Sequence, residues 1–258
     1  MIESGANAQV KKIKKIKNSA RFRREQRMFV VEGWKMLGEA IRHGLVREIF
    51  ISENAVPEWK KRAYSLDCPV MTVSSPLFQE LSDTVTPQGV LALTEMPVYE
   101  LHEMAAPRDA ALLILENIQD PGNLGTMMRT LEGAGMSGIV LGKGCVDILN
   151  PKVVRATMGS LFRVPFFLSD QLAADVKELK SKGFTMYAAH LAGKQHYMGI
   201  GGRGKTGILI GNEANGLSEE ISGLADCLVK IPMEGELESL NAAVSAALLM
   251  YELYRNRQ

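Results

Sequence analysis

The stretch Ile231 to Arg255, IPMEGELESLNAAVSAALLMYELYR, joins a polar turn directly to an apolar helix. In the turn, the proline lacks a backbone donor and the glycine permits a tight bend, so this part is not a regular element. From Leu240 onward apolar residues recur at helical spacing, and Ser239 is the expected N-cap. Asn241 stands near the helix start, where it either helps to cap the helix or faces a ligand. We therefore expect a ligand-binding turn at the start of a helix rich in small residues.

Two further polar loops follow apolar runs that are typical of buried parallel strands. The run from Ala111 to Leu115 leads into the polar segment 116–129, and the run 207–210 leads into the segment 211–216, which is rich in glycine and asparagine. A last strand, 227–231, leads into the turn described above. Ligands bind at the carboxyl ends of the strands in open α/β sheets, so the three loops predict one shared site.

The rest of the chain alternates short apolar runs with helical patterns, which is typical of an α/β fold. In the second half we expect further strands at 139–141, 164–168 and 184–189, with helices at 124–134, 151–158 and 171–182. In the first half we expect strands at 28–31, 46–51, 70–73 and 90–93. A polar stretch between Pro97 and Pro107 separates the halves. We predict a smaller N-terminal domain over 1–97, a linker over 98–109 and a second domain over 110–258.

Length and composition exclude several classes of protein. At 258 residues with 46% hydrophobic and 23% charged residues, the chain has an ordinary soluble composition. No apolar run approaches the roughly 20 residues that span a bilayer, and the N-terminus lacks a signal-peptide pattern, so we expect a cytoplasmic protein without membrane contact. The cysteines Cys68, Cys145 and Cys227 are far apart, which argues against a disulfide framework and against a metal site.

Residues 1–35 are strongly basic, although the net charge of the whole chain is only +1. Phosphate contacts supply most of the non-specific affinity for nucleic acid, so this arm predicts a polyanion-binding extension. A solvated basic face or a flexible tail is the alternative. The residues that we expect to contact nucleic acid are Lys11, Lys12, Lys14, Lys15, Arg21, Arg23 and Arg24.

Within the three loops, particular side chains could carry chemistry. Asn123 stands just before a helix that carries Arg129 about two turns in, among apolar neighbours. Glu213 lies in the second loop, where it could receive hydrogen bonds from a ligand or from Arg129. The segment 199–204 fits the dinucleotide pattern G-x-G-x-x-G, but a strand-like run follows it instead of a helix, so we interpret it as a loop.

The three loops together resemble the three motifs of the SpoU/TrmH family of RNA ribose 2'-O-methyltransferases. The matching segments are NLGTMMR at 123–129, GNEANG at 211–216, and IPM at 231–233 with SLNAAVS at 239–245. The resemblance implies the SPOUT α/β fold, in which a mostly parallel sheet is threaded into a trefoil knot, and it implies a homodimer. The first half resembles the small L30e-like domain that binds RNA substrates in many family members.

The resemblance also implies S-adenosylmethionine as the cofactor. The methyl transfer that it implies requires no metal. Gly211, Ile231 and Leu240 are then expected to contact the cofactor through the main chain, with Ala189, His190, Asn212 and Met233 as neighbours. A guanidinium stays protonated in proteins, so we expect Arg129 to orient the ribose hydroxyl and to stabilise negative charge on its oxygen. Glu213 or a phosphate would take the proton, and Asn123 and Asn241 would position Arg129 and the ribose.

The resemblance favours ribosomal RNA of the 23S type as the substrate, because a whole domain and a basic arm precede the motifs. A transfer-RNA 2'-O-methyltransferase is the first alternative. A methyltransferase that acts on a base nitrogen is another, although the pair Asn123 and Arg129 argues against it. A non-catalytic RNA-binding or ribosome-assembly factor that retains the fold is the alternative of a different class.

Overall fold

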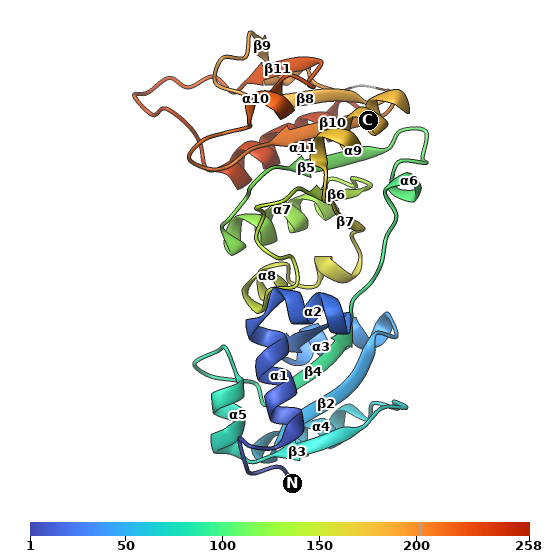
Figure 1. Ribbon diagram of the computed structural model, residues 1–258, viewed down its shortest axis with the longest axis vertical. Helices are drawn as coiled ribbons and strands as arrows, with labels where there is room; N and C mark the ends of the chain where they lie inside the picture. The colour runs from blue at the N-terminus through green and yellow to red at the C-terminus, as the bar shows by residue number, and fades with distance from the viewer. Residues whose placement is uncertain (202) are drawn as a thin grey trace. The chain divides into compact units, whose positions relative to one another are not determined.

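The computed structural model describes residues 1–201 and 203–258, and the chain divides into two compact units. The first unit consists of residues 1–97 and 147–162, and the second of residues 98–146 and 163–258 (Figure 1). Each unit holds its own sheet. The sheets have four and seven strands, so both units are mixed α/β structures.

The first unit is built on a four-stranded sheet in the order β1-β4-β2-β3. Strand β4 is antiparallel to β1 and β2, while β2 and β3 are parallel. The strands are β1 (Met28–Glu32), β2 (Val46–Ser52), β3 (Val70–Val73) and β4 (Val90–Glu95). The helices are α1 (Ala8–Asn18), α2 (Ala20–Gln26), α3 (Trp34–Arg42), α4 (Val56–Arg62), α5 (Ser75–Leu81) and α8 (Pro151–Ala156), with 3-10 turns η1 (Glu53–Ala55) and η2 (Ser160–Phe162).

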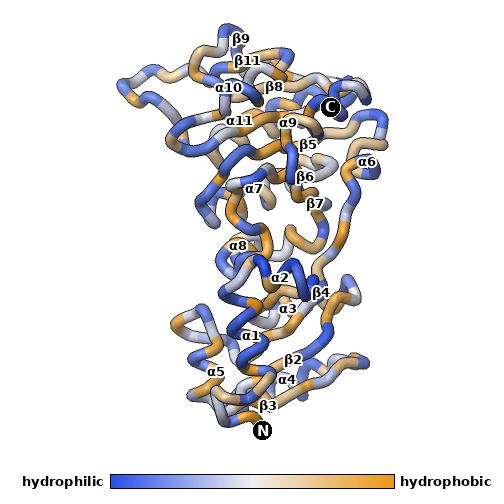
Figure 2. Tube along the Cα trace, in the orientation of Figure 1, coloured by the Kyte–Doolittle hydropathy of each residue, from blue (hydrophilic) through white to orange (hydrophobic). Residues whose placement is uncertain are grey.

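The basic arm is helical and forms part of the core of this unit. The side chains of Val10, Ile13 and Ile16 in α1 are fully buried, and they pack with residues of α5 and the sheet. Most of the other residues of α1 and α2 are hydrophilic, and these helices are mostly blue in Figure 2. The alternative of a flexible tail is therefore wrong, because a helix that buries an apolar stripe is held by tertiary packing.

The segment 147–162 belongs to the first unit, although the predicted division placed it in the second domain. The ring of Phe162 lies 6.0 Å from the ring of Phe29 and 6.0 Å from that of His43, measured between centroids. Asp147 forms an ion pair with Arg23 at 2.5 Å. The sequence showed one continuous alternation of helices and strands here, and only these long-range contacts reveal the excursion.

The second unit is built on a seven-stranded sheet in the order β7-β6-β5-β10-β8-β11-β9, and all its pairings are parallel. The strands are β5 (Ala111–Leu115), β6 (Gly138–Leu141), β7 (Phe166–Leu168), β8 (Thr185–Ala189), β9 (Gln195–His196), β10 (Thr206–Ile210) and β11 (Cys227–Lys230). The helices are α6 (Leu101–Met104), α7 (Pro121–Gly133), α9 (Leu172–Ser181), α10 (Glu219–Ser222) and α11 (Ala242–Arg255), with a 3-10 turn η3 (Tyr197–Gly199). The predicted mostly parallel α/β sheet is confirmed.

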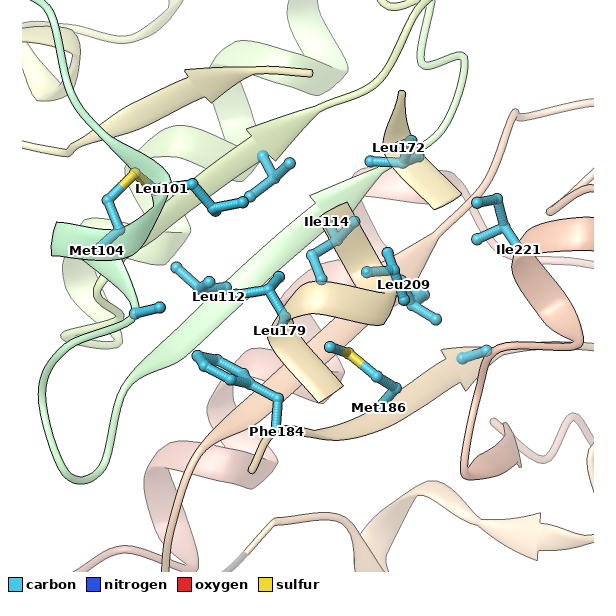
Figure 3. Packing of buried hydrophobic residues seen from close by; sticks show 14 of the residues in the cluster. Leu101, Met104, Leu112, Ile114, Leu172, Leu179, Phe184, Met186, Leu209 and Ile221 are labelled. Carbon is cyan, nitrogen blue, oxygen red and sulfur yellow. The ribbon is translucent and has the colours of Figure 1, made fainter. Parts of the chain in front are cut away.

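A continuous apolar core lies beside the central strands of this sheet. Figure 3 shows Leu112 and Ile114 of β5 next to Leu209 of β10, Met186 of β8 and Leu179 of α9. These side chains are buried because a parallel sheet is covered by helices on its faces. The core holds the strands rigidly, so the loops at their ends start from fixed positions.

The structure differs from the sequence prediction at one strand of this unit and agrees with it at one loop. The short strand β9 was not predicted, because two residues give no periodicity. After the segment 199–204 the chain enters strand β10 at Thr206, so no helix follows the glycines and the dinucleotide pattern is rejected. Gly202 of that pattern lies outside the described residues.

Candidate functional site

The carboxyl ends of β8, β10 and β11 surround a cavity of about 320 Å³. These three strands are parallel neighbours, with β8 between β10 and β11, so their ends meet at one edge of the sheet. All seven residues predicted to contact a cofactor line this cavity, namely Ala189, His190, Gly211, Asn212, Ile231, Met233 and Leu240. The predicted loops after β10 and β11 both line the cavity, whereas no residue of the predicted segment 116–129 is part of its lining.

The loop after β10 forms one wall of the cavity and is closed on itself. The amide of Asn212 donates to the carbonyl of Gly216 at 2.9 Å, and the amide of Gly216 donates back to Asn212 at 2.9 Å. The side-chain oxygen of Asn212 accepts from the amides of Ala214 and Asn215, while its nitrogen donates to the carbonyl of Asn117 at 2.8 Å. Asn212 therefore both shapes this loop and ties it to the loop after β5.

Gly211 sits where the loop backbone passes closest to the strand end. A Cβ atom at this position would lie 2.1 Å from the carbonyl carbon of Gly216 and 2.2 Å from the amide nitrogen of Leu217. Both contacts are with backbone and far shorter than van der Waals distance, so no side chain fits here. The glycine is required by close packing of two backbone segments.

A row of polar side chains joins the three loops beside the cavity. The side-chain nitrogen of Asn241 donates to the side-chain oxygen of Asn123 at 3.0 Å. The side-chain nitrogen of Asn123 donates in turn to a carboxylate oxygen of Glu213 at 2.9 Å. Glu213 also lines the cavity. Residues that lie up to 118 positions apart in the sequence thus form one hydrogen-bonded row, which we call the amide row.

Asn241 caps the helix, which is one of the two roles that the sequence left open. It is the N-cap of α11, and its side-chain oxygen accepts from the amides of Ala243 at 2.9 Å and Val244 at 3.3 Å. The expected N-cap at Ser239 is therefore wrong, because the helix begins at Ala242. With its oxygen occupied by the cap, the amide nitrogen of Asn241 remains to bind Asn123.

A second polar contact, which the sequence did not single out, fixes the outer end of the loop after β10. Glu116 follows directly after β5, and its carboxylate accepts from the amide and the hydroxyl of Ser218, each at 2.7 Å. Ser218 is the N-cap of α10. A carboxylate immediately after a buried strand was the available signal, but its partner lies 102 residues further along the chain.

Arg129 lies apart from the amide row. It follows Asn123 by six residues on α7, which is about 9 Å along the helix axis. Its side chain is exposed and forms no hydrogen bond or ion pair with the residues that the structure describes. The expectation that Asn123 and Asn241 position Arg129 is therefore wrong for this structure, because the two amides bind each other and Glu213. Its guanidinium is available to a ligand.

The predicted nucleic-acid contacts of the basic arm have very different surroundings. Arg23 is only 3% exposed, and it binds Asp147 and the carbonyls of Ile16 and Lys17. Its prediction as an RNA contact is wrong, because a guanidinium enclosed by the protein cannot reach a phosphate.

Several other basic residues of the arm are paired within the first unit. Lys12 binds Glu48 at 2.5 Å, Lys14 lies 3.4 Å from Glu80, and Arg21 binds Glu25 at 2.7 Å. The ammonium of Lys15 lies 4.0 Å from the ring centroid of Phe22. Lys11 and Arg24 are exposed, and neither takes part in an ion pair with a described residue.

The described part of the chain has neither a metal-binding cluster nor a membrane-spanning helix. No group of three or more His, Cys, Asp or Glu side chains there is placed to hold a metal ion. None of the described helices is long and apolar enough to cross a bilayer. The three cysteines are free, and burial raises the pKa of the Cys145 thiol, which disfavours its reactive thiolate.

Known protein families match both halves of the chain. The family described as the SpoU rRNA Methylase family matches residues 110–251, which is more than half of the chain. The chain belongs to the SpoU rRNA methylase family. A second match, to the MRM3-like substrate binding domain, covers residues 7–92. The family and the fold predicted from the three motifs are therefore confirmed.

Similar proteins can be aligned with almost the whole length of this SpoU family member. It is 34% identical over 254 residues, 98% of each chain, to a Bacillus subtilis protein named 23S rRNA (guanosine(2553)-2'-O)-methyltransferase RlmP. The structure of an AdoMet-bound rRNA methyltransferase from Sinorhizobium meliloti has a TM-score of 0.87 at 29% identity, covering 98% of this chain and 97% of that one. The SpoU methyltransferase AviRb from Streptomyces viridochromogenes, in complex with AdoMet, has a TM-score of 0.87 at 26% identity, covering 96% and 97%.

Proposed function

We propose that this SpoU family member transfers a methyl group from S-adenosylmethionine to a ribose 2'-hydroxyl in 23S-type ribosomal RNA. The observation that carries the proposal is the amide row, which brings all three family motifs to the edge of one cavity. The choice of ribosomal RNA is supported by the Bacillus subtilis relative, whose name specifies a 2'-O-methyltransferase of 23S rRNA and which matches over 98% of both chains.

The cavity fits S-adenosylmethionine in size and in chemistry. Its lining combines the side chains of Ile231, Met233 and Leu240 with the backbone of the loop after β10. A purine needs apolar walls and a few polar backbone groups at its edges, and this lining offers both. Backbone of Gly211 and Ile231 is the expected anchor, with His190 at the rim. When bound, S-adenosylmethionine supplies a methyl group on a positively charged sulfur.

The side chains beside the cavity act on the ribose. Glu213 lines the cavity and its carboxylate is held by Asn123, so it is placed to accept the proton that leaves the 2'-hydroxyl. Asn241 holds Asn123 in turn. Arg129 stabilises negative charge on the 2'-oxygen, which is worth roughly 3 kcal/mol by analogy with a single oxyanion-hole donor. An RNA phosphate is the competing proton acceptor.

The role of Arg129 is tested by Arg129→Lys and Arg129→Ala. Both variants are expected to lower kcat by about 100-fold, because about 3 kcal/mol of transition-state stabilisation is lost. The affinity for S-adenosylmethionine, measured by calorimetry, should not change. Arg108→Lys, at another exposed arginine of the second unit, is the matched control. If Arg129→Lys kept near-wild-type turnover with unchanged cofactor binding, the assignment would be wrong.

We further propose that the chain forms a homodimer through α11. This helix leaves Val244 48%, Tyr251 50% and Tyr254 42% exposed on the monomer. Large apolar side chains gathered on one helix are typical of a protein interface. Tyr251→Arg is expected to convert the dimer into a monomer in size-exclusion chromatography with light scattering. Val85→Arg, at a residue of the first unit that is 92% exposed, should leave the oligomeric state unchanged.

The substrate is tested by mapping 2'-O-methyl groups in ribosomal and transfer RNA from cells with and without the gene. Loss of one ribosomal site supports the proposal, whereas loss of a transfer-RNA site overturns the substrate and keeps the chemistry. Unchanged maps, together with failure of the chain to bind S-adenosylmethionine, would indicate the non-catalytic RNA-binding factor. We also propose a cytoplasmic location, which cell fractionation tests.

A further inference from the structure

The two tryptophans of this chain meet on the surface of the first unit. The rings of Trp34 and Trp59 are stacked, with centroids 6.5 Å apart and an interplanar angle of 25°. The ring of Tyr64 extends the cluster, 5.4 Å from that of Trp59. All three side chains are half-buried, so each ring keeps an accessible part. Three aromatic rings side by side at a surface form a platform on which flat groups can stack.

Local backbone geometry brings these rings together. Trp34 is the first residue of α3, and Trp59 lies in α4. Helix α4 ends at Arg62, and its C-cap residue Ala63 adopts the left-handed conformation with φ of 49°. This conformation is costly for a residue with a Cβ atom, and it reverses the chain so that Tyr64 returns to Trp59.

Basic residues accompany the rings, with Arg62 in contact and three lysines adjacent in sequence. The guanidinium of Arg62 lies 4.6 Å from the centroid of a Trp34 ring, and it also binds Glu58 at 2.8 Å. The exposed residues Lys35, Lys60 and Lys61 are neighbours of these residues in sequence. None of the three lysines takes part in an ion pair with a described residue. We call the three rings, the three lysines and Arg62 the aromatic patch.

The aromatic patch differs from helices α1 and α2 of the basic arm in how its charges are used, although Trp34 and Lys35 also belong to the stretch 1–35. In the arm, Lys12, Arg21 and Arg23 bind carboxylates of the same unit, so much of their charge is neutralised. In the patch, none of the three lysines forms an ion pair with a described residue, and each stands within two positions of a tryptophan in the sequence. Unpaired bases bind proteins by stacking on aromatic rings while cations hold the flanking phosphates. The patch combines these two features, whereas the charges of Lys12, Arg21 and Arg23 are paired with carboxylates.

We propose that the aromatic patch binds an unpaired segment of the RNA substrate, with bases stacked on the rings of Trp34 and Trp59 and phosphates held by Lys35, Lys60 and Lys61. This inference rests on the proposed function for the identity of the RNA, and it adds the surface that recognises it. The net positive charge of the patch favours a polyanion over an apolar protein partner. A duplex is disfavoured because its bases are stacked on each other and are not available to the rings.

The tryptophans themselves report on the binding. Because both lie in the patch, titration of the full-length protein with an unlabelled RNA hairpin that has an unpaired loop is expected to quench tryptophan emission. A fully paired duplex of the same composition should quench much less. Absence of quenching by the hairpin at concentrations that saturate RNA binding, measured by anisotropy of a labelled copy, would overturn the proposal.

Substitutions separate stacking from folding. Trp34→Leu with Trp59→Leu is expected to weaken hairpin binding by about 10-fold or more, since stacking of one base is worth about 1–3 kcal/mol. Trp34→Phe with Trp59→Phe retains aromatic faces and should stay within about threefold of wild type by the same reasoning. Hairpin affinities that are equal in the leucine and phenylalanine variants would contradict stacking. Thermal unfolding checks that both variants are folded.

Charge is tested in parallel with a matched control. Lys35→Gln, Lys60→Gln and Lys61→Gln together should reduce the slope of log Kd against log salt concentration by about 2, from three lost phosphate contacts at about 0.7 each. Lys12→Gln with Lys14→Gln should change the slope little, because these ammonium groups face Glu48 and Glu80. An unchanged slope in the triple variant would contradict phosphate binding at the patch.

The outcomes distinguish this inference from the proposed function. If wild type and patch variants methylate RNA with the same kcat/KM, the patch has no part in recognition, while the proposed function stands. If the patch binds the hairpin but no RNA is methylated by the wild type with S-adenosylmethionine, the proposed function fails and the binding surface stands.

Discussion

Replacing Gly211 with alanine is expected to disrupt the cavity wall without touching any charged group. The added Cβ atom would lie 2.1 Å from the carbonyl carbon of Gly216, 2.2 Å from the amide nitrogen of Leu217 and 2.3 Å from the carbonyl oxygen of Gly216. All three contacts are with backbone, so no side-chain rotation relieves them. The loop after β10 has to move away from the strand end.

The size of the effect follows from what this movement breaks. The loop is closed by two backbone hydrogen bonds between Asn212 and Gly216, each worth about 1 kcal/mol net. Overpacking of this kind costs about 1–3 kcal/mol in proteins. An unfavourable contribution of about 2 kcal/mol to the closed loop corresponds to roughly a 30-fold increase in Kd for S-adenosylmethionine. Isothermal titration calorimetry of wild type and variant measures this difference.

Gly235→Ala is the matched control, because a Cβ atom at Gly235 meets nothing within 4 Å. It changes the same type of residue in the loop after β11 and should bind S-adenosylmethionine with the wild-type Kd. Circular dichroism confirms that both variants are folded. If Gly211→Ala bound S-adenosylmethionine within about threefold of wild type, the reasoning from the closed loop would be refuted, because that difference is below 1 kcal/mol.

Three further predictions follow from polar contacts. Asn123→Ala removes two side-chain hydrogen bonds and should lower kcat for methyl transfer more than it lowers the affinity for S-adenosylmethionine, because it frees Glu213, the carboxylate that we propose as the proton acceptor. Arg23→Ala leaves Asp147 without its partner and should lower the free energy of unfolding, measured in urea titrations, by about 3–5 kcal/mol. The control Arg21→Ala breaks an exposed ion pair and should lower it by less than about 1 kcal/mol. Asp226→Asn should lower stability near neutral pH and flatten the acid side of the stability profile.

The sign of the pH effect comes from the surroundings of Asp226. Burial acts to raise the pKa of this carboxyl, but hydrogen bonds from Lys180 and from the amide of Met186 outweigh it, so its pKa lies below the usual value. The contribution of Asp226 to the free energy of unfolding is therefore present above the unfolded pKa of about 3.9. This contribution is lost as the pH falls through the lower folded pKa. An equally steep acid transition in Asp226→Asn and wild type, followed by urea unfolding between pH 2 and 6, would contradict this assignment.

The elements that the sequence predicted well are those with strong local signals. The run Ala111–Leu115 is a strand over the expected residues, because five consecutive buried apolar residues define it. The helix around Asn123 was placed three residues late, since Pro121 stands at its first turn and Asp120 caps it. Pro at the first helical position is favourable, so this start could have been recognised from the sequence.

The basic arm shows where charge counting fails. Its lysines and arginines suggested a nucleic-acid contact, yet Val10, Ile13 and Ile16 form the buried side of the same helix. The apolar stripe was present in the sequence at helical spacing, but the carboxylates that pair with the basic residues come from β2, α5 and the segment 147–162. Neutralisation of a charge by a distant partner cannot be predicted from its own segment.

The sequence by itself determined the parallel α/β unit, the three polar loops at the strand ends and the family to which they belong, because each of these depends on local pattern and on motif spacing. Only the tertiary structure decided that Asn241, the cap of α11 in the stretch Ile231 to Arg255, also binds Asn123 and thereby Glu213. It alone placed Arg129 outside that row and gathered both tryptophans at one surface. The physical reason is that a hydrogen bond or a ring contact depends on distance in space, whereas sequence pattern reports only which face of an element is buried.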